Sequence, residues 1–135
     1  MSVLVDTSGL LAVLDADDSN HQRGRPTWEA LISSCEPLHT SNYVLLELIA
    51  VAQRRLGLDA IRALHTDVLP LLTVHWVIEE EHTAAAASLL LVGRRDLSLV
   101  DCVSFDLMRR CGLSRAFTFD SHFARQGFEC LPGGA

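Results

Sequence analysis

Lysine is missing from this chain of 135 residues, in which all 11 basic side chains are arginine. The four cysteines form no C-x-x-C pair, and no apolar run approaches the roughly 20 residues that cross a membrane. Codon usage in a GC-rich genome is the simplest explanation for the missing lysine. The cysteine pattern argues against a zinc site, and the short apolar runs predict a protein without membrane spans.

The sequence also lacks the marks of export. Its start, Met1-Ser2-Val3-Leu4, has no basic segment before the apolar residues, unlike a secretory signal. The thiols stand in apolar or helical contexts, and cytosolic thiols stay reduced. We therefore expect a soluble cytoplasmic protein with four reduced, structural cysteines: Cys35, Cys102, Cys111 and Cys130.

Positive charge is scarce as well. The net charge is −6 and the isoelectric point is near 5.4, which argues against broad non-specific affinity for nucleic acids. Metal bound to acidic residues would offset part of this charge locally. Arginine's planar fork suits phosphate. Three doublets are therefore candidates for phosphate contacts: Arg54-Arg55, Arg94-Arg95 and Arg109-Arg110.

What the chain does contain is a regular alternation of short apolar segments with helical ones. Strands are predicted at residues 3–5, 38–40, 73–78, 116–119 and 128–131. Helices are predicted at residues 7–14, 26–34, 42–56, 59–69, 79–91 and 99–111, with a polar loop at 15–24. This order predicts a single α/β domain over residues 1–135, with a central parallel sheet covered by helices on both faces.

Four acidic residues adjoin strongly apolar sequence: Asp6, Glu47, Asp101 and Asp120. Burying an unpaired carboxylate costs free energy comparable with the stability of a whole domain. Hard divalent cations such as Mg²⁺ bind carboxylate oxygens and offset that cost. Asp6 and Asp120 each follow a predicted strand, and ligands of parallel sheets gather at the carboxyl ends of strands. The four acids are therefore candidate metal ligands.

Three of these acids also have a structural explanation that the sequence leaves open. Asp6 can cap the first helix, Asp101 forms an S-x-x-D capping pattern, and Asp120 can start a turn. Glu47 is harder to explain in this way, because its helical neighbours three and four positions away include no basic residue. An unpartnered glutamate on an apolar helix face favours a functional role.

Other reactive side chains form no comparable pattern. The sequence has no G-x-S-x-G elbow for a serine nucleophile. Its six histidines are scattered, and no two show the i, i+4 spacing of a metal pair on one helix. We expect only His122, two residues after Asp120, to lie near the acids.

Four motifs occur in a family-like order: Val5-Asp6-Thr7-Ser8, then Thr40-Ser41 leading into Leu45-Leu46-Glu47-Leu48, then Leu97-Ser98-Leu99-Val100-Asp101, and finally Thr118-Phe119-Asp120-Ser121-His122-Phe123. Together they resemble the PIN-domain ribonucleases, particularly the VapC-type toxins of bacterial toxin–antitoxin pairs. The resemblance covers essentially the whole chain. It departs at Cys102, where the family usually has alanine, and at residues 23–26; neither departure involves the acids.

The resemblance implies a three-layer PIN fold with strand order 3-2-1-4-5. It implies an endoribonuclease that uses Mg²⁺, or Mn²⁺, and leaves a 5′-phosphate and a 3′-hydroxyl. The metal site would consist of Asp6, Glu47, Asp101 and Asp120, with Asp6 and Asp120 as direct ligands. The hydroxyl groups expected close by are those of Ser8 or Thr7 and of Thr118.

Two other functions stay open. A phosphatase with an aspartyl nucleophile would also have an aspartate after its first strand, but it normally has a second one two residues later, where this chain has Ser8. A catalytically silent PIN module that binds RNA or protein is the other alternative. The presence of all four acids argues against it.

The resemblance also implies partners. A VapB-type antitoxin would lay its C-terminal segment across the acidic cleft and place an arginine among the carboxylates. Residues 45–52 and 56–72 supply more apolar surface than a small domain readily buries, so we expect a homodimer with an apolar groove beside it. The alternative is that these leucines pack the core of a monomer.

Overall fold

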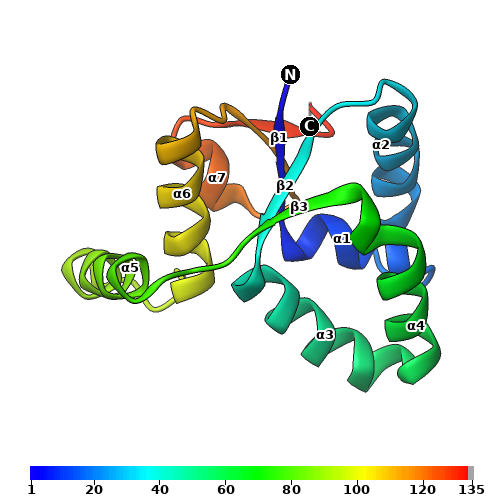
Figure 1. Cartoon of the computed structure of the whole chain (residues 1–135), viewed down its shortest axis with the longest axis horizontal. Coiled ribbons are helices and arrows are strands. Elements are labelled where there is room, and N and C mark those ends of the chain that lie inside the picture. The colour runs from blue at the N-terminus through cyan, green and yellow to red at the C-terminus, as the bar shows by residue number, and fades with distance from the viewer. Residues whose placement is uncertain (134–135) are drawn as a thin grey trace.

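The structure, a computed structural model, describes residues 1–133. The last two residues of the domain expected over residues 1–135 lie outside the described residues. Strands and helices alternate along the chain, as Figure 1 shows. The strands are β1 Val3–Val5, β2 Leu38–Ser41, β3 Leu72–His75, β4 Arg115–Phe117 and β5 Glu129–Leu131. The helices are α1 Thr7–Leu14, α2 His21–Ser33, α3 Asn42–Leu56, α4 Leu58–Ala63, α5 Glu79–Val92, α6 Leu99–Cys111 and α7 Ser121–Arg125.

All five strands are parallel and form one sheet in the order β3-β2-β1-β4-β5. This confirms the expected fold class and strand order. The central strand β1 pairs with β4 so that Val5, its last residue, lies opposite Phe117, the last residue of β4. The chain segments that follow these two strands therefore begin side by side, at the carboxyl edge of the sheet.

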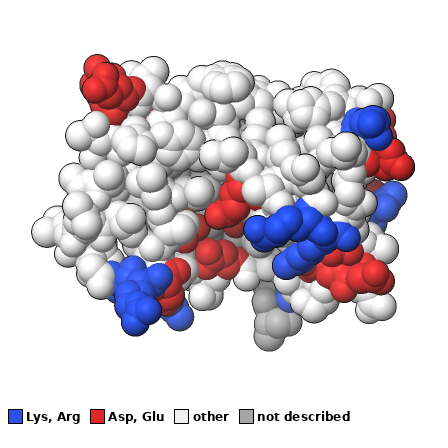
Figure 2. Space-filling view, turned by 90° about the horizontal axis from the view of Figure 1, so that it is seen from below, with Lys and Arg blue, Asp and Glu red and all other residues white. Residues whose placement is uncertain are grey.

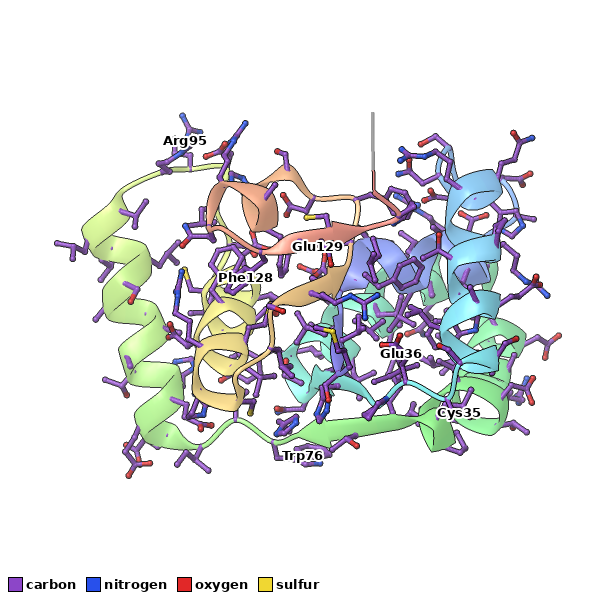
Figure 3. The ribbon with its side chains drawn as sticks, turned by 90° about the horizontal axis from the view of Figure 1, so that it is seen from above. Cys35, Glu36, Trp76, Arg95, Phe128 and Glu129 are labelled. Atoms are coloured by element: carbon purple, nitrogen blue, oxygen red, sulfur yellow. The ribbon has the colours of Figure 1, made fainter. Side chains whose placement is uncertain are left out.

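The central strand faces a hydrophobic core on each side. Val3 and Val5 pack into one core together with Trp28, whereas Leu4 packs into the other together with Met108. This alternation is the period-two pattern of a strand that is covered on both faces. Figures 1 and 3 show α1, α2 and α4 on one side of the sheet and α5, α6 and α7 on the other. The expected three-layer arrangement is thus confirmed.

Two strands end earlier than the sequence predicts. β3 ends at His75 rather than at residue 78, because the amide of Val77 donates to the side chain of Asn42 (2.8 Å). β4 ends at Phe117 rather than at residue 119, because the amide of Phe119 donates to the hydroxyl of Ser8 (2.9 Å). In both cases a side chain replaces the next strand as hydrogen-bond partner and turns the chain away from the sheet.

The helix α2 begins at His21, not at Pro26, so the loop predicted at residues 15–24 is too long. The helix starts early because the carbonyl of Asn20 accepts hydrogen bonds from helix amides, including that of Gly24 (2.8 Å). Gly24 is a packing residue here: a β-carbon at this position would lie 2.9 Å from that of Ala12. The close approach of α1 and α2 depends on it.

The helix predicted over residues 59–69 is also interrupted. α4 gives way to a π-helical segment, Leu64–Val68, and then to a 3-10 turn, Leu69–Leu71. Pro70 lies in that turn and, lacking an amide proton, cannot continue an α-helix. Within the described part of the chain, the helices are all too short or too polar to cross a bilayer.

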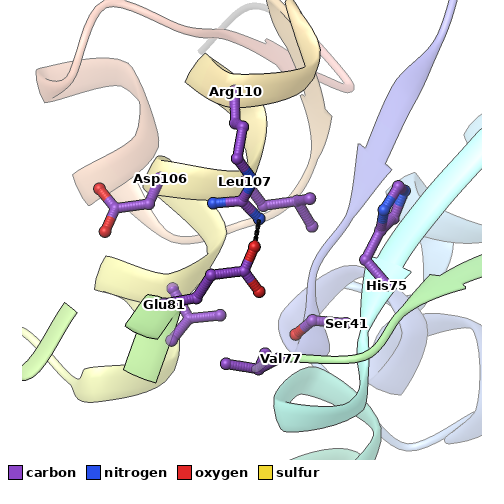
Figure 4. A pocket seen from close by; sticks show the side chains of 8 residues that line it. Ser41, His75, Val77, Glu81, Asp106, Leu107 and Arg110 are labelled. Carbon is purple, nitrogen blue, oxygen red and sulfur yellow. Dashed lines mark ion pairs between the residues drawn. The ribbon is translucent and has the colours of Figure 1, made fainter. Parts of the chain in front are cut away.

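The helix α5 is held to α6 by an ion pair between Glu81 and Arg110 (3.0 Å), drawn in Figure 4. Glu81 also accepts a hydrogen bond from the amide of Ile78 (3.1 Å), which lies just before the helix. One side chain therefore fixes both where α5 begins and where it docks. The outer face of α5 remains open, since Leu90 and Leu91 are 81% and 89% exposed.

Gly9 marks the closest approach of α1 to the sheet. A β-carbon at this position would lie 2.6 Å from the carbonyl oxygen of Phe117 and 2.8 Å from its ring. The backbone of β4 cannot move aside, so we expect Gly9→Ala to lower the free energy of unfolding by about 1–3 kcal/mol, although alanine favours helix formation. Urea denaturation measures this. Gly133→Ala, whose β-carbon would have its nearest neighbour at 3.8 Å, is the control, and an equal loss there would contradict the explanation.

Candidate functional site

Asp6 follows β1 directly, at the carboxyl edge of the sheet, and is only 4% exposed. Its backbone begins α1, but within the described chain its side chain does not cap that helix. Its Oδ2 instead accepts hydrogen bonds from the hydroxyls of Ser8 and Thr118, each at 2.9 Å. The helix-capping explanation for this acid is therefore wrong. Two hydroxyl groups, one from each of the neighbouring strand ends, hold the carboxylate in place.

These hydroxyls also join the two chain segments that leave the sheet. Ser8 Oγ lies 3.2 Å from Thr118 Oγ1, and Thr118 Oγ1 accepts a hydrogen bond from the amide of Asp120 (3.0 Å). Of the two hydroxyls left open by the sequence, the one that contacts Asp6 is that of Ser8. The hydroxyl of Thr7 is buried and has no hydrogen-bond partner among residues 1–133.

Asp101 and Asp120 each have a structural role of the kind that the sequence left open. Asp101 Oδ2 accepts from the amide of Ser98 (3.1 Å), and the Ser98 hydroxyl accepts from the amide of Asp101 (3.1 Å), which forms a capping box for α6. Asp120 Oδ1 accepts from the amide of His122 (2.9 Å) at the start of α7. These bonds engage one oxygen of each carboxylate, so capping does not exclude a further role.

The charges of the three aspartates act on one another. Burial raises the pKa of Asp6 from 3.8 to about 6, the hydrogen bonds from Thr118 and Ser8 oppose this, and the charge of Asp101 adds to it. Burial also raises the pKa of Asp101, and the charge of Asp120 contributes. Asp6 and Asp101 are therefore close enough to repel each other, as are Asp101 and Asp120, and burial disfavours the charged forms of Asp6 and Asp101.

Glu47 stands apart from this cluster. It lies half-buried on α3 and lines an apolar pocket together with Leu99 and Val100, the two residues that precede Asp101. The structure thus brings three of the four candidate acids into one electrostatic group. The fourth, Glu47, lines a pocket that is also lined by Val100, the residue before Asp101.

A divalent cation suits the chemistry of these donors. Within residues 1–133 no group of three or more His, Cys, Asp or Glu side chains is already arranged to hold a metal ion, so the carboxylates would have to rotate inward. All of the available donors are oxygens, which hard cations such as Mg²⁺ and Mn²⁺ prefer. The buried, unpartnered hydroxyl of Thr7 adds another oxygen beside Asp6. The residues present therefore fit a hard cation.

The residues around Glu47 were not found from the sequence. Tyr43, one helical turn before it, places its hydroxyl 2.5 Å from Nδ1 of His82 on α5. Both side chains line the pocket of Glu47. The expectation that His122 alone lies near the acids is therefore wrong. One feature of the sequence could have indicated an aromatic residue beside Glu47: the chain's single tyrosine stands four positions before it, on the same helix face.

The histidines are also less scattered than their positions in the chain suggest. His39 on β2 and His75 on β3 stack, and Nδ1 of the first lies 2.9 Å from Nε2 of the second. Burial lowers the pKa of His39, and the nearby His75 lowers it further. Spacing within one helix cannot reveal a pair that forms between neighbouring strands.

Each of the three arginine doublets has one member in an ion pair. The pairs are Arg55 with Asp15 and Asp18, Arg94 with Asp96, and Arg110 with Glu81. Figure 2 shows the face at the carboxyl ends of the strands: acidic groups lie in its hollowed centre, and basic groups lie on both flanks. A phosphate chain that crosses the centre would therefore meet positive charge on either side.

The raised pKa of Asp6 predicts a pH dependence of stability in metal-free protein. Because the folded state binds this proton more tightly than the unfolded state, the stabilising contribution is complete below pH 3.8 and is lost as the pH rises through about 6. We expect Asp6→Asn to be more stable than the wild type by about 3 kcal/mol at neutral pH, and by little at pH 4. Urea denaturation in EDTA at several pH values measures the difference. A difference that stays constant with pH would contradict the pKa shift.

Comparison with known proteins connects this chain to a family. The PIN domain family matches residues 3–129. The 23S rRNA-specific endonuclease VapC20 of Mycobacterium tuberculosis is 32% identical over 127 residues, which are 93% of this chain and 95% of that protein. The crystal structure of VapC20, described as a sarcin-ricin loop cleaving toxin, matches with a TM-score of 0.80 and 31% identity over 93% of this chain and 95% of that one.

A more distant structure shares the fold alone. FitAcB from Neisseria gonorrhoeae matches with a TM-score of 0.69 at 17% identity, and the match covers 96% of each chain. The family match and the VapC20 relationship, by contrast, rest on sequence and span nearly the whole chain. Together with the parallel sheet in the order 3-2-1-4-5, they show that this protein belongs to the PIN domain family.

Proposed function

We propose that this protein is a divalent-metal-dependent endoribonuclease and the toxin of a toxin–antitoxin pair. The observation that carries the proposal is the cluster of Asp6, Asp101 and Asp120 at the carboxyl edge of the sheet, where burial raises the pKa of Asp6 to about 6. Concentrating carboxylates in this way opposes folding, and a hard cation is the partner that offsets the cost. The relative of known activity is an endonuclease that acts on RNA.

The four carboxylates would bind the metal in two ways. Asp6 and Asp120 would bind Mg²⁺ or Mn²⁺ directly, and Asp101 and Glu47 would bind it directly or through water. When bound, such a cation polarises the scissile phosphate and makes a water molecule more acidic. The protein's own part is to hold these oxygens at the carboxyl ends of β1 and β4, where an RNA backbone can reach them.

Neighbouring groups prepare the carboxylates for this role. The hydroxyls of Ser8 and Thr118 hold Asp6, the capping box with Ser98 holds Asp101, and the amide of His122 holds Asp120. None of these contacts depends on substrate. One oxygen of each carboxylate is therefore already engaged before RNA arrives, and the metal would have to draw the carboxylates together.

The proposed substrate is RNA, and the target of the relative, 23S rRNA, is the first to test. Arginines on the flanks of the acidic hollow would attract its phosphates. The proposed place of action is the cytoplasm, where ribosomes are found.

The chemistry of the product ends tests the proposed reaction. We expect purified protein with Mg²⁺ to cut 23S rRNA into fragments with a 5′-phosphate and a 3′-hydroxyl. Ligation assays that require a 5′-phosphate, together with mass spectrometry of the fragments, identify the ends. A 2′,3′-cyclic phosphate would indicate a metal-free ribonuclease and would contradict the proposal.

The alternative is a catalytically silent PIN module that binds RNA or protein. One observation favours it, namely that the described residues contain no preformed group of three metal-binding side chains. The same RNA assay decides, since a silent module leaves the RNA intact at every Mg²⁺ concentration. A phosphatase with an aspartyl nucleophile is less well supported, because Ser8 stands where such an enzyme normally has its second aspartate.

The proposal includes two protein partners. A VapB-type antitoxin would place an arginine among the carboxylates and so replace the charge of the cation. A homodimer is the second proposed partnership.

Much of the apolar surface expected to form the dimer packs the core instead: Leu45, Leu48, Ala52, Leu64 and Val68. Leu58 and Leu71 remain exposed and support the dimer. Light scattering on purified protein tests it, and co-expression with a neighbouring small gene tests the antitoxin.

A further inference from the structure

An apolar pocket of about 440 Å³ opens between α3 and the starts of α5 and α6. The carboxylate-bearing residue Glu47 lies in its lining. The other lining residues are Tyr43, Leu46, Ala50, His82, Leu99 and Val100. Its volume falls within the range of pockets that hold small organic groups.

The aromatic wall of this pocket is held in place from two sides. The ring of Tyr43 packs against the second hydrophobic core, and its hydroxyl bonds to Nδ1 of His82 (2.5 Å). The two rings meet edge to face with their centroids 5.8 Å apart. A ring anchored in this way can offer a flat surface without losing further conformational freedom on binding.

The pocket and the acidic site share residues that are the same as, or next to, the candidate acids. Glu47 lines it on α3, and on α6 Val100 lines it immediately before Asp101. A group bound in the pocket would therefore lie beside the residues that carry the carboxylates Glu47 and Asp101. Exposed apolar surface of this kind marks a binding site, and an RNA base is an apolar group that lies next to a phosphate.

We propose that this pocket receives an unpaired base of the RNA substrate, from a nucleotide that flanks the scissile phosphate, and that Tyr43 is the surface on which the base stacks. This inference rests on the proposed ribonuclease function. Unpaired RNA bases stack on aromatic side chains, whereas bases inside a helix cannot reach such a wall. The hydroxyl of Tyr43 and the ring of His82 place hydrogen-bonding groups at the rim, where the polar edge of a base would lie.

The test combines a change in the protein with a change in the RNA. We expect Tyr43→Leu, which keeps an apolar side chain but removes the flat ring, to lower kcat/KM by about 10- to 100-fold. In the wild type, an abasic residue at one nucleotide flanking the cleavage site should cause a similar loss. In Tyr43→Leu the same abasic residue should cause no further loss, because the two changes remove one interaction. Independent losses that multiply at every position would overturn the proposal.

Trp76→Leu is the matched control. Trp76 is another large aromatic residue, 73% exposed, and it follows β3 at the outer edge of the sheet (Figure 3), outside the lining of the pocket. We expect its kcat/KM and its response to abasic RNA to equal those of the wild type. An equal effect of Trp76→Leu and Tyr43→Leu would show a general response to lost aromatic surface, and would overturn the assignment of the pocket.

A second measurement needs neither cleavage nor a change at Tyr43. Single-stranded RNAs that each carry one 5-iodouridine at a different position are irradiated with Asp6→Asn protein, and mass spectrometry identifies the crosslinked residue. A crosslink to Tyr43 supports the pocket even if the wild type cuts no RNA, a result that would defeat only the proposed function. A crosslink elsewhere, or none despite RNA binding, overturns the pocket. So does a Tyr43→Leu protein that changes oligomeric state, since the pocket would then be a subunit contact.

Discussion

Asp6→Asn lowers the rate of RNA cleavage by at least about 100-fold, because even residues that only support a metal ligand are worth 10- to 100-fold. The amide keeps the shape of the side chain and can still accept hydrogen bonds from Ser8 and Thr118. It removes the negative charge that a hard cation requires. Single-turnover cleavage of a labelled RNA at saturating Mg²⁺ measures the loss, and circular dichroism checks that the fold is unchanged.

The control for this variant is Asp59→Asn. The Asp59 side chain is 97% exposed and pairs only with the exposed Arg62 at 2.7 Å among the described ion pairs. The same chemical change at this position should leave the cleavage rate at the wild-type value. Wild-type activity in Asp6→Asn, or an equal loss in Asp59→Asn, would be incompatible with a metal site built on Asp6.

Removing divalent metal stops cleavage, and restoring it brings cleavage back. We expect protein dialysed against EDTA to lose its activity on RNA, and Mg²⁺ or Mn²⁺ to restore it, since carboxylates alone cannot act as the Lewis acid that neutralises charge on the scissile phosphate. Ca²⁺ at the same concentration is an informative comparison, because it binds oxygen ligands but prefers a larger and less regular coordination shell. Activity that survived exhaustive chelation would point to metal-free chemistry.

Binding of the metal has a readout that does not depend on catalysis. A ligand that binds only the folded protein raises the free energy of unfolding by about 2.7 kcal/mol at 100 times its dissociation constant. Titration with Mg²⁺ should therefore stabilise the wild type against urea, and should stabilise Asp6→Asn far less. Equal stabilisation of the two proteins would place the cation elsewhere on the surface.

The fold and the proximity of three of the four acids followed from sequence for physical reasons that can be named. Val3-Leu4-Val5 is a short, continuous run of β-branched and apolar residues that ends at an aspartate, as is typical of a parallel strand covered on both faces, and both cores contact it. Asp6 and Asp120 follow adjacent parallel strands, so their proximity is a consequence of strand order. Which of these acids caps a helix was harder to predict. Asp6 stands at a position where aspartate often caps, but in the structure its side chain accepts hydrogen bonds from Ser8 and Thr118 instead.

The features that escaped prediction depend on contacts between distant elements. The pair of Tyr43 and His82 needs α5 to dock beside α3, and no property of either segment alone specifies that geometry. The early end of β4 has the same origin, since it requires the hydroxyl of Ser8 to capture the amide of Phe119. The local pattern of apolar residues predicts which segments form helices and strands, whereas hydrogen bonds between distant segments determine where those helices and strands end.

The different hydrogen bonds of the three aspartates predict the order in which they would be replaced during evolution if activity were no longer selected. Asp101 and Asp120 cap helices, so their loss would cost about 1 kcal/mol of stability each as well as activity. Asp6 caps nothing, and its replacement by asparagine relieves a buried charge. Once selection for cleavage is relaxed, a lineage would therefore lose Asp6 first and keep the other two for the sake of folding. Inactive descendants should carry that asymmetric signature.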